Sequence, residues 1–226
     1  MAETGWRSEI LEVNEARSER VARTYTRVTR LYETWARLTE GRPRRRVLEL
    51  AEVRDGEAVL EVATGTGAQL VELARRNPSG RTVGVELAEG MLEETRKRLT
   101  AAGMDGVELR RASALALPLE DQSFDLLVNG YMLDLLPRDD IPRALGEFKR
   151  VLRPGARVVL SNMTRGERRR HRVWDALYAR GINLTANCRG VLAAPVLDEL
   201  GFEHVRREYM AQAGFPTEIV TARKPR

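Results

Sequence analysis

The chain has few of the residues on which metal binding, disulfide bonding and base stacking depend: one cysteine, two histidines and 5% aromatic residues in 226. A single cysteine, Cys188, cannot form an intramolecular disulfide, and it fits a reducing compartment. With only His171 and His204 beside it, no metal site is expected, and Cys188 is read as a packing residue. The aromatic residues do not interleave with the arginines, so nucleic acid is not an expected partner.

Long apolar runs are also missing. No stretch is long enough to span a bilayer, and residues 1–9 contain no apolar segment of the kind that a signal peptide needs. We therefore expect a cytoplasmic protein. Its length is enough for one domain with a sizeable core, and no repeat or low-complexity tract interrupts the sequence.

The basic residues are almost all arginine, and the formal net charge is +5. Arginines cluster at 42–46 and again at 165–172. Such clusters can hold the protein at an anionic membrane surface, so peripheral membrane contact is one interpretation. A solvated helix face explains the same pattern, and composition alone favours that alternative.

The most informative stretch is residues 59–68, Val-Leu-Glu-Val-Ala-Thr-Gly-Thr-Gly-Ala. A short apolar run rich in β-branched residues predicts a strand, the glycines predict a tight turn, and an apolar-periodic helix follows over 69–76. A second strand, 81–85, ends in the acid Glu86. A strand, a glycine turn, a helix and a second strand with a terminal carboxylate are typical of a nucleotide site, where the carboxylate takes ribose hydroxyls.

The details of this turn argue against a pyrophosphate ligand. The dinucleotide fingerprint needs a third glycine where this chain has Leu70, and no Gly-Lys-Ser or Gly-Lys-Thr of a P-loop follows. S-adenosylmethionine, which carries a ribose and a sulfonium but no phosphate, fits the two glycines and the acids Glu61 and Glu86. An ordinary βα turn whose glycines serve packing is the alternative.

Further motifs follow in a fixed order. The series is Glu61–Gly67, Thr82–Met91, Ala112–Leu119, Ser123–Asn129 and Arg150–Gly155. In these motifs the chain resembles the class I S-adenosylmethionine-dependent methyltransferases over roughly residues 57 to 162. Within them it is most similar to the ubiquinone/menaquinone C-methyltransferase-like group.

The alternation of patterns and the resemblance imply an α/β fold: a Rossmann-like, doubly wound, seven-stranded sheet, mostly parallel with an antiparallel C-terminal strand. Strands are predicted over 58–62, 81–86, 106–111, 124–129, 156–162, 202–211 and 217–223, the last two joined by a five-residue link. Helices are predicted over 67–76, 88–102, 139–152, 174–180 and 193–200. Residues 56–226 would form the methyltransferase domain, with an acceptor-pocket insertion near 163–190.

Residues 1–55 are predicted to be a helical N-terminal lid. A short helix begins near residue 10, and apolar residues at three- and four-residue steps from Val21 to Leu38 indicate a longer one. Gly41-Arg42-Pro43 is predicted to break it, and a third helical segment follows over 47–53.

The resemblance implies a set of cofactor-binding residues. In it, Glu86 accepts the ribose hydroxyls, Met91 covers the adenine, and Tyr25 of the lid reaches the methionine carboxylate; helix packing explains Met91 and Tyr25 nearly as well. Ser113 stands where relatives carry Asp or Asn, and serine is a shorter and weaker partner for the adenine edge. The full set is Tyr25, Glu61, Ala63, Thr64, Gly65, Thr66, Gly67, Glu86, Leu87, Met91, Ser113, Ala114, Asn129 and Gly130.

The sequence leaves the catalytic base, the acceptor and the oligomeric state open. The candidates for a base are His171, in an arginine cluster that lowers its pKa, and Tyr25. Apolar residues and arginines of the lid and the insertion favour a small or lipid-like acceptor, first a prenylated quinol or phenol. The alternatives are a phosphatidylethanolamine N-methyltransferase, another small-molecule methyltransferase, an RNA methyltransferase and a non-catalytic module that binds S-adenosylmethionine.

Overall fold

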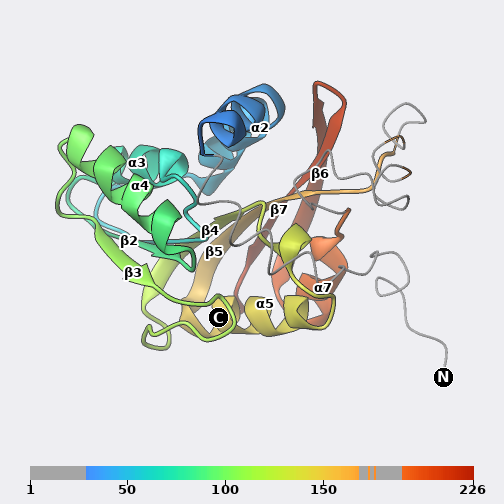
Figure 1. The fold of residues 1–226 in the computed structure, drawn as a ribbon. Helices are drawn as coiled ribbons and strands as arrows, with labels where there is room; N and C mark the ends of the chain where they lie inside the picture. The colour runs from blue at the N-terminus through green and yellow to red at the C-terminus, as the bar shows by residue number, and fades with distance from the viewer. Residues whose placement is uncertain (1–28, 168–172, 174–175, 177–189) are drawn as a thin grey trace.

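The computed structural model describes residues 29–167, 173, 176 and 190–226. A seven-stranded sheet with the order β3-β2-β1-β4-β5-β7-β6 forms the centre (Figure 1). Its strands are β1 (Ala58–Val62), β2 (Arg81–Glu86), β3 (Glu108–Arg111), β4 (Phe124–Gly130), β5 (Leu152–Met163), β6 (Glu203–Gln212) and β7 (Phe215–Arg223). The helices are α2 (Thr29–Ala51), α3 (Ala68–Arg75), α4 (Glu89–Ala101), α5 (Asp140–Val151) and α7 (Ala193–Glu199), with a short 3-10 helix, η2 (Leu133–Leu135). The predicted doubly wound fold is confirmed.

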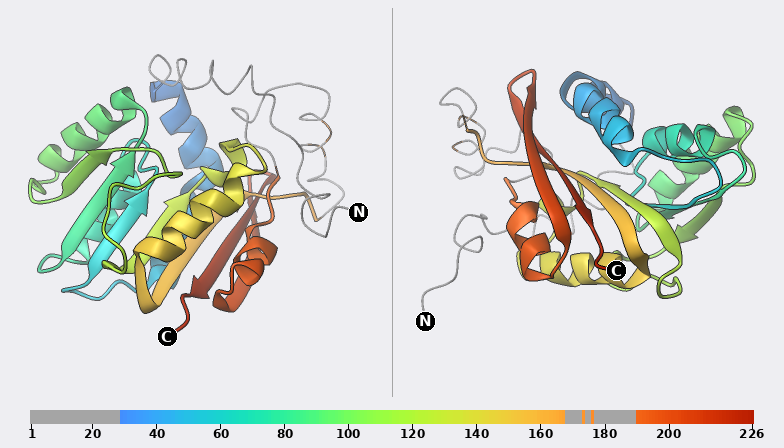
Figure 2. Two further views of the ribbon diagram at one scale, coloured as in Figure 1. Left: turned by 90° about the horizontal axis from the view of Figure 1, so that it is seen from below. Right: turned by 180° about the vertical axis from the view of Figure 1, so that it is seen from behind.

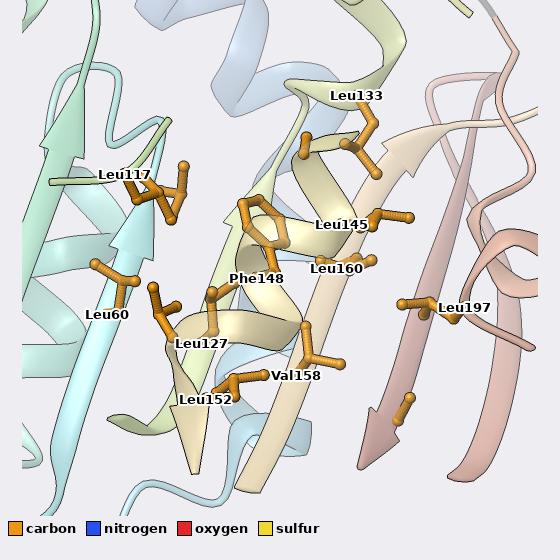
Figure 3. Packing of buried hydrophobic residues seen from close by; sticks show 14 of the residues in the cluster. Leu60, Leu117, Leu127, Leu133, Leu145, Phe148, Leu152, Val158, Leu160 and Leu197 are labelled. Atoms are coloured by element: carbon orange, nitrogen blue, oxygen red, sulfur yellow. The ribbon is translucent and has the colours of Figure 1, made fainter. Parts of the chain in front are cut away.

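Helices cover both faces of the sheet. Helices α2, α3 and α4 lie on one side and α5 and α7 on the other (Figures 1 and 2). The side chains of each strand alternate between the two layers: Leu60 and Leu127 pack toward Phe148 of α5 (Figure 3), whereas Val59 and Leu126 pack with Val47 of α2. Both faces are therefore buried, which explains why the strands read as nearly continuous apolar runs.

The C-terminal hairpin also follows the prediction, with a shorter link. Strands β6 and β7 pair antiparallel, and β7 pairs antiparallel with β5. Gln212 pairs with Phe215, so only Ala213 and Gly214 form the turn rather than five residues. Both have positive φ, 50° and 80°, the backbone that a two-residue hairpin turn requires.

The predicted helix break at Gly41-Arg42-Pro43 is wrong. Helix α2 runs without interruption from Thr29 to Ala51 and contains Pro43. Strand β6 supports it there: Gln212 Oε1 accepts the backbone N–H of Arg42 at 2.6 Å, and the Glu208 carboxylate accepts Nε and Nη2 of Arg46 at 2.9 and 2.8 Å. Tertiary contacts to a strand remote in sequence thus override the local helix-breaking signal.

Several predicted features lie outside the described residues. They are the helix near residue 10, the first part of the predicted 21–38 helix, and most of the predicted 174–180 helix, together with Tyr25, His171 and Cys188. The structure therefore does not test the extent of the lid or of the insertion near 163–190.

Candidate functional site

The candidate site lies at the carboxyl ends of the central strands. The strand order reverses between β1 and β4, which is the position where open α/β sheets bind ligands. A pocket opens there. It is lined from α2, from the turn between β1 and α3, and from the ends of β4 and β5 by Arg44, Glu61, Ala63, Thr64, Gly65, Thr66, Ala68, Gln69, Gly130, Tyr131 and Ser161.

The two glycines of the turn have different roles. A Cβ on Gly67 would lie 2.7 Å from Cγ2 of Thr95, so the packing of α4 requires that glycine. A Cβ on Gly65 would have no protein atom within 4 Å, and Gly65 lines the pocket. Both have positive φ, 76° and 55°. Packing therefore explains Gly67, while Gly65 leaves space open for a ligand.

The carboxylate of Glu86 joins the end of β2 to this turn. Its Oε2 accepts the N–H of Gly65, and its Oε1 accepts the N–H groups of Leu87 and Ala88, each at 2.9 Å. Burial raises the pKa of Glu86, and these three N–H groups act against the rise. A carboxylate has about four acceptor positions, so holding both hydroxyls of a ribose requires one of these backbone bonds to open.

Glu61 is the second acid of the site, and it is 3% exposed. Its Oε1 accepts Nε2 of Gln69 at 3.1 Å, while Oε2 has no hydrogen-bond partner. Burial raises the pKa of Glu61 to about 8, against the lowering effect of the Arg44 guanidinium. A buried carboxyl oxygen without a partner, in a pocket wall, is suited to a cationic ligand group such as an ammonium.

Arg44 and Gln69 are residues of this pocket that sequence reasoning missed. Arg44 donates to Oε2 of the buried Glu40 at 2.7 Å and lines the pocket, so one arginine of the 42–46 cluster belongs to the site. Gln69 interrupts an otherwise apolar helix start eight residues after Glu61. That isolated polar residue was a usable signal, whereas Arg44 was hidden among its neighbours.

The structure brings part of the expected set together. Six of the expected residues line the pocket: Glu61, Ala63, Thr64, Gly65, Thr66 and Gly130. Asn129 lies just beneath, fully buried, and its Nδ2 donates to the carbonyl of Val62 at 2.8 Å, which joins β4 to β1.

None of the other expected residues that the structure describes lines the pocket: they are Gly67, Glu86, Leu87, Met91, Ser113, Ala114 and Asn129. Tyr25 lies outside the described residues. Leu87 is 61% exposed directly beside Glu86, and Met91 is buried, as core packing explains. Ser113 Oγ accepts the N–H of Leu115 at 3.2 Å, and Ala114 packs against the main core. Their contact with adenine stays a prediction.

We expect binding of S-adenosylhomocysteine at pH 7 to release about one proton. Glu61 is protonated at pH 7 because its pKa is about 8, and a bound ammonium favours its charged form and lowers that pKa. Affinity therefore falls as the pH drops below 8. Calorimetry in two buffers of different ionisation enthalpy measures the released proton. The Glu61→Gln variant should release no proton. If the wild-type protein also releases none, Glu61 does not contact the ligand's ammonium.

Comparisons with known proteins agree with this geometry. Residues 59–155 match a family model described as a methyltransferase domain. A demethylmenaquinone methyltransferase of Staphylococcus aureus (strain JH9) is 34% identical over 151 residues, which cover 65% of this chain and 61% of that relative.

Solved structures share the fold at lower identity. The cyclase SpnF superposes with a TM-score of 0.73 at 19% identity, over 92% of this chain and 97% of that one. A SAM-dependent methyltransferase from Aquifex aeolicus gives 0.59 at 17% identity, over 92% and 98%. Because one of these neighbours is a cyclase, the fold alone does not define the reaction.

The fold and the glycine turn are those expected of a class I methyltransferase domain, the type whose methyl donor is S-adenosylmethionine. Residues 59–155 of this chain match a methyltransferase domain, as their motifs predicted. The curated relative extends further: the matched stretch spans about three fifths of its length.

Within the described part of the chain, no helix has the length and apolarity needed to cross a membrane. In the same residues, no group of three or more His, Cys, Asp or Glu side chains is arranged to hold a metal ion.

Proposed function

We propose that this protein catalyses transfer of a methyl group from S-adenosylmethionine to a small or lipid-like acceptor, first a prenylated quinol or phenol. One observation carries the cofactor half of this proposal. Glu61, with an unpartnered carboxyl oxygen, and the Arg44 guanidinium line the same pocket beside the glycine turn. An acidic side chain and a positively charged side chain in one pocket complement, respectively, the ammonium and the carboxylate of the cofactor's amino-acid end.

The residues of the chain would bind and orient rather than react. When bound, S-adenosylmethionine supplies an already activated methyl group on a cationic sulfur. Gly65 leaves room beside the turn, Glu86 holds the ribose side, and Glu61 and Arg44 fix the opposite end. Such fixed alignment lowers the barrier of an in-line displacement because the orientation is established before reaction. His171 and Tyr25 remain the candidates for a base, outside the described residues.

The acceptor assignment has two supports. The curated relative with 34% identity is named a demethylmenaquinone methyltransferase. The pocket wall beyond Gly130 includes Tyr131. A lipid-like acceptor is met at a membrane surface, and the side chains of Arg42 and Arg45 on α2 are exposed. We therefore propose a cytoplasmic protein that contacts anionic membrane peripherally.

The test is an acceptor panel with methyl-labelled S-adenosylmethionine. The panel contains a prenylated 1,4-naphthoquinol without a ring methyl and phosphatidylethanolamine vesicles, and S-adenosylhomocysteine binding is measured by calorimetry. We expect binding at micromolar concentration and label in the quinol only. Label in phosphatidylethanolamine alone would replace the quinol with the lipid amine. Binding without any labelled product would favour a non-catalytic module, and absence of binding would overturn the proposal.

A further inference from the structure

The hydroxyl of Ser161 has no hydrogen-bond partner although the residue is 1% exposed. Ser161 lies in β5, the strand between β4 and β7, where it pairs with Gly130 on one side and Ile219 on the other. It also lines the pocket. The pocket therefore has an unused hydrogen-bonding group at its β5 end, separate from Glu61.

The fold does not account for this serine. It follows Val158-Val159-Leu160, and valine or isoleucine would suit a buried strand position better. A buried hydroxyl without a partner is destabilising relative to a satisfied one. A ligand that hydrogen-bonds to Ser161 removes that penalty.

Ser161 lies outside the part of the pocket that is proposed to hold the cofactor. Strands β2, β1, β4 and β5 are consecutive in the sheet, and continuing their registers by one residue places Glu86, Gly130 and Ser161 in one row. Three strand spacings separate Glu86 from Ser161, which is about 14 Å. Glu61, on β1, is two strand spacings across and two residues along from Ser161, about 12 Å. The ribose and the ammonium therefore lie on the other side of Gly130.

The residues around Ser161 indicate what kind of ligand group would bind there. Tyr131 continues the same wall, and its hydroxyl is 3.0 Å from Oγ1 of Thr217, so its polar atom points away to a partner. Its ring packs with Phe215 and Met163 in a small apolar cluster. A Cβ on Gly130 would lie 3.2 Å from Ser161 Oγ, so the glycine keeps this hydroxyl accessible. An aromatic residue in the wall beside one neutral hydroxyl suits a ring that carries a hydrogen-bonding oxygen.

We propose that Ser161 Oγ and the Tyr131 ring form the acceptor subsite, in which Ser161 hydrogen-bonds an oxygen of an aromatic acceptor and sets specificity for it. This inference rests on the proposed methyl transfer and names the residue that selects the substrate. Ser161 binds the acceptor here, and it takes no part in the displacement itself.

The test compares Ser161→Ala with Ser123→Ala. Ser123 Oγ donates to the carbonyl of Glu120 at 2.7 Å beside the first residue of β4, at the opposite end of that strand from Gly130. Probe binding is measured by anaerobic equilibrium dialysis in saturating S-adenosylhomocysteine. The probes are a short-chain prenylated 1,4-naphthoquinol and its two analogues that each lack one ring hydroxyl. Melting temperature, the Kd of S-adenosylhomocysteine, and KM and kcat for the quinol complete the comparison.

We expect Ser161→Ala to weaken quinol binding and raise its KM about tenfold, the effect of one hydrogen bond, with kcat and the Kd of S-adenosylhomocysteine within twofold. Its melting temperature should be equal or higher, because no protein hydrogen bond is lost. One of the two analogues that lack a single hydroxyl should bind both proteins equally. Ser123→Ala should lower the melting temperature and leave binding unchanged.

Each other outcome overturns the inference in a recognisable way. A raised Kd of S-adenosylhomocysteine in Ser161→Ala would assign Ser161 to the cofactor instead. Equal quinol binding by wild type and Ser161→Ala would overturn the subsite alone. A wild-type protein that binds S-adenosylhomocysteine but none of the aromatic probes would overturn the subsite together with the quinol acceptor, and leave the cofactor site intact.

Discussion

Gly65→Val is expected to raise the Kd of S-adenosylhomocysteine at least a hundredfold while the protein stays folded. No protein atom lies within 4 Å of the position that a Cβ would take, and Gly65 lines the pocket, so the branched side chain enters the space proposed for the ligand. A hundredfold change corresponds to about 2.7 kcal/mol. Calorimetry measures the binding, and thermal unfolding shows that the fold is kept.

The control for this variant is Gly103→Val. Gly103 also has a positive φ, 68° against 55° for Gly65, and a Cβ added there would likewise meet no protein atom within 4 Å. It follows α4, away from the pocket. Both variants carry the same kind of backbone strain, about 1–2 kcal/mol, so both should melt at similarly reduced temperatures. Normal binding by Gly65→Val would place the ligand elsewhere on the protein.

Glu86→Ala is expected to raise the Kd of S-adenosylhomocysteine at least tenfold, or about 1.4 kcal/mol. The substitution removes the acceptor proposed for the ribose hydroxyls. It also leaves the N–H of Gly65 without the carboxylate that holds the turn in place, so the ligand loses a contact and a preorganised wall.

Glu108→Ala is the matched control for Glu86→Ala. Glu108 is the first residue of the neighbouring β3, and it pairs with Arg81 and Arg110 at the surface rather than with the turn. Its removal should leave the Kd unchanged. If Glu86→Ala binds as tightly as Glu108→Ala, Glu86 has only a structural role in the β1–α3 turn.

The elements of the sheet were predictable because their signals are local. The strand β1 was predicted at its observed bounds from a five-residue apolar run before a glycine turn, and β2 from a second run ending in Glu86. Gly67 and Gly65 were both recognised as site glycines. Sequence alone did not separate the one that α4 packing requires from the one that leaves space open, since that distinction depends on Thr95, 28 residues away from Gly67 in the chain.

The residues that were missed depend on contacts between distant segments. Pro43 predicted a helix end, yet α2 continues because Gln212 and Glu208 support it from β6. Arg44 then reaches the pocket from within that helix, although its cluster suggested a solvated face. Ser161 directly follows an apolar run, but only the three-dimensional arrangement shows that its hydroxyl has no partner.

The support of α2 by β6 has a consequence for the order in which the protein matures. Hydrogen bonds that bridge 170 and 162 residues, from Arg42 to Gln212 and from Arg46 to Glu208, fix the helix that carries Arg44. During synthesis, the glycine turn and its strands leave the ribosome well before β6 does. A nascent chain can therefore assemble the turn, while helix α2, which carries Arg44 into the pocket, is anchored only after the final hairpin has emerged. Nascent or C-terminally shortened chains should for that reason have an incomplete pocket on an otherwise recognisable scaffold.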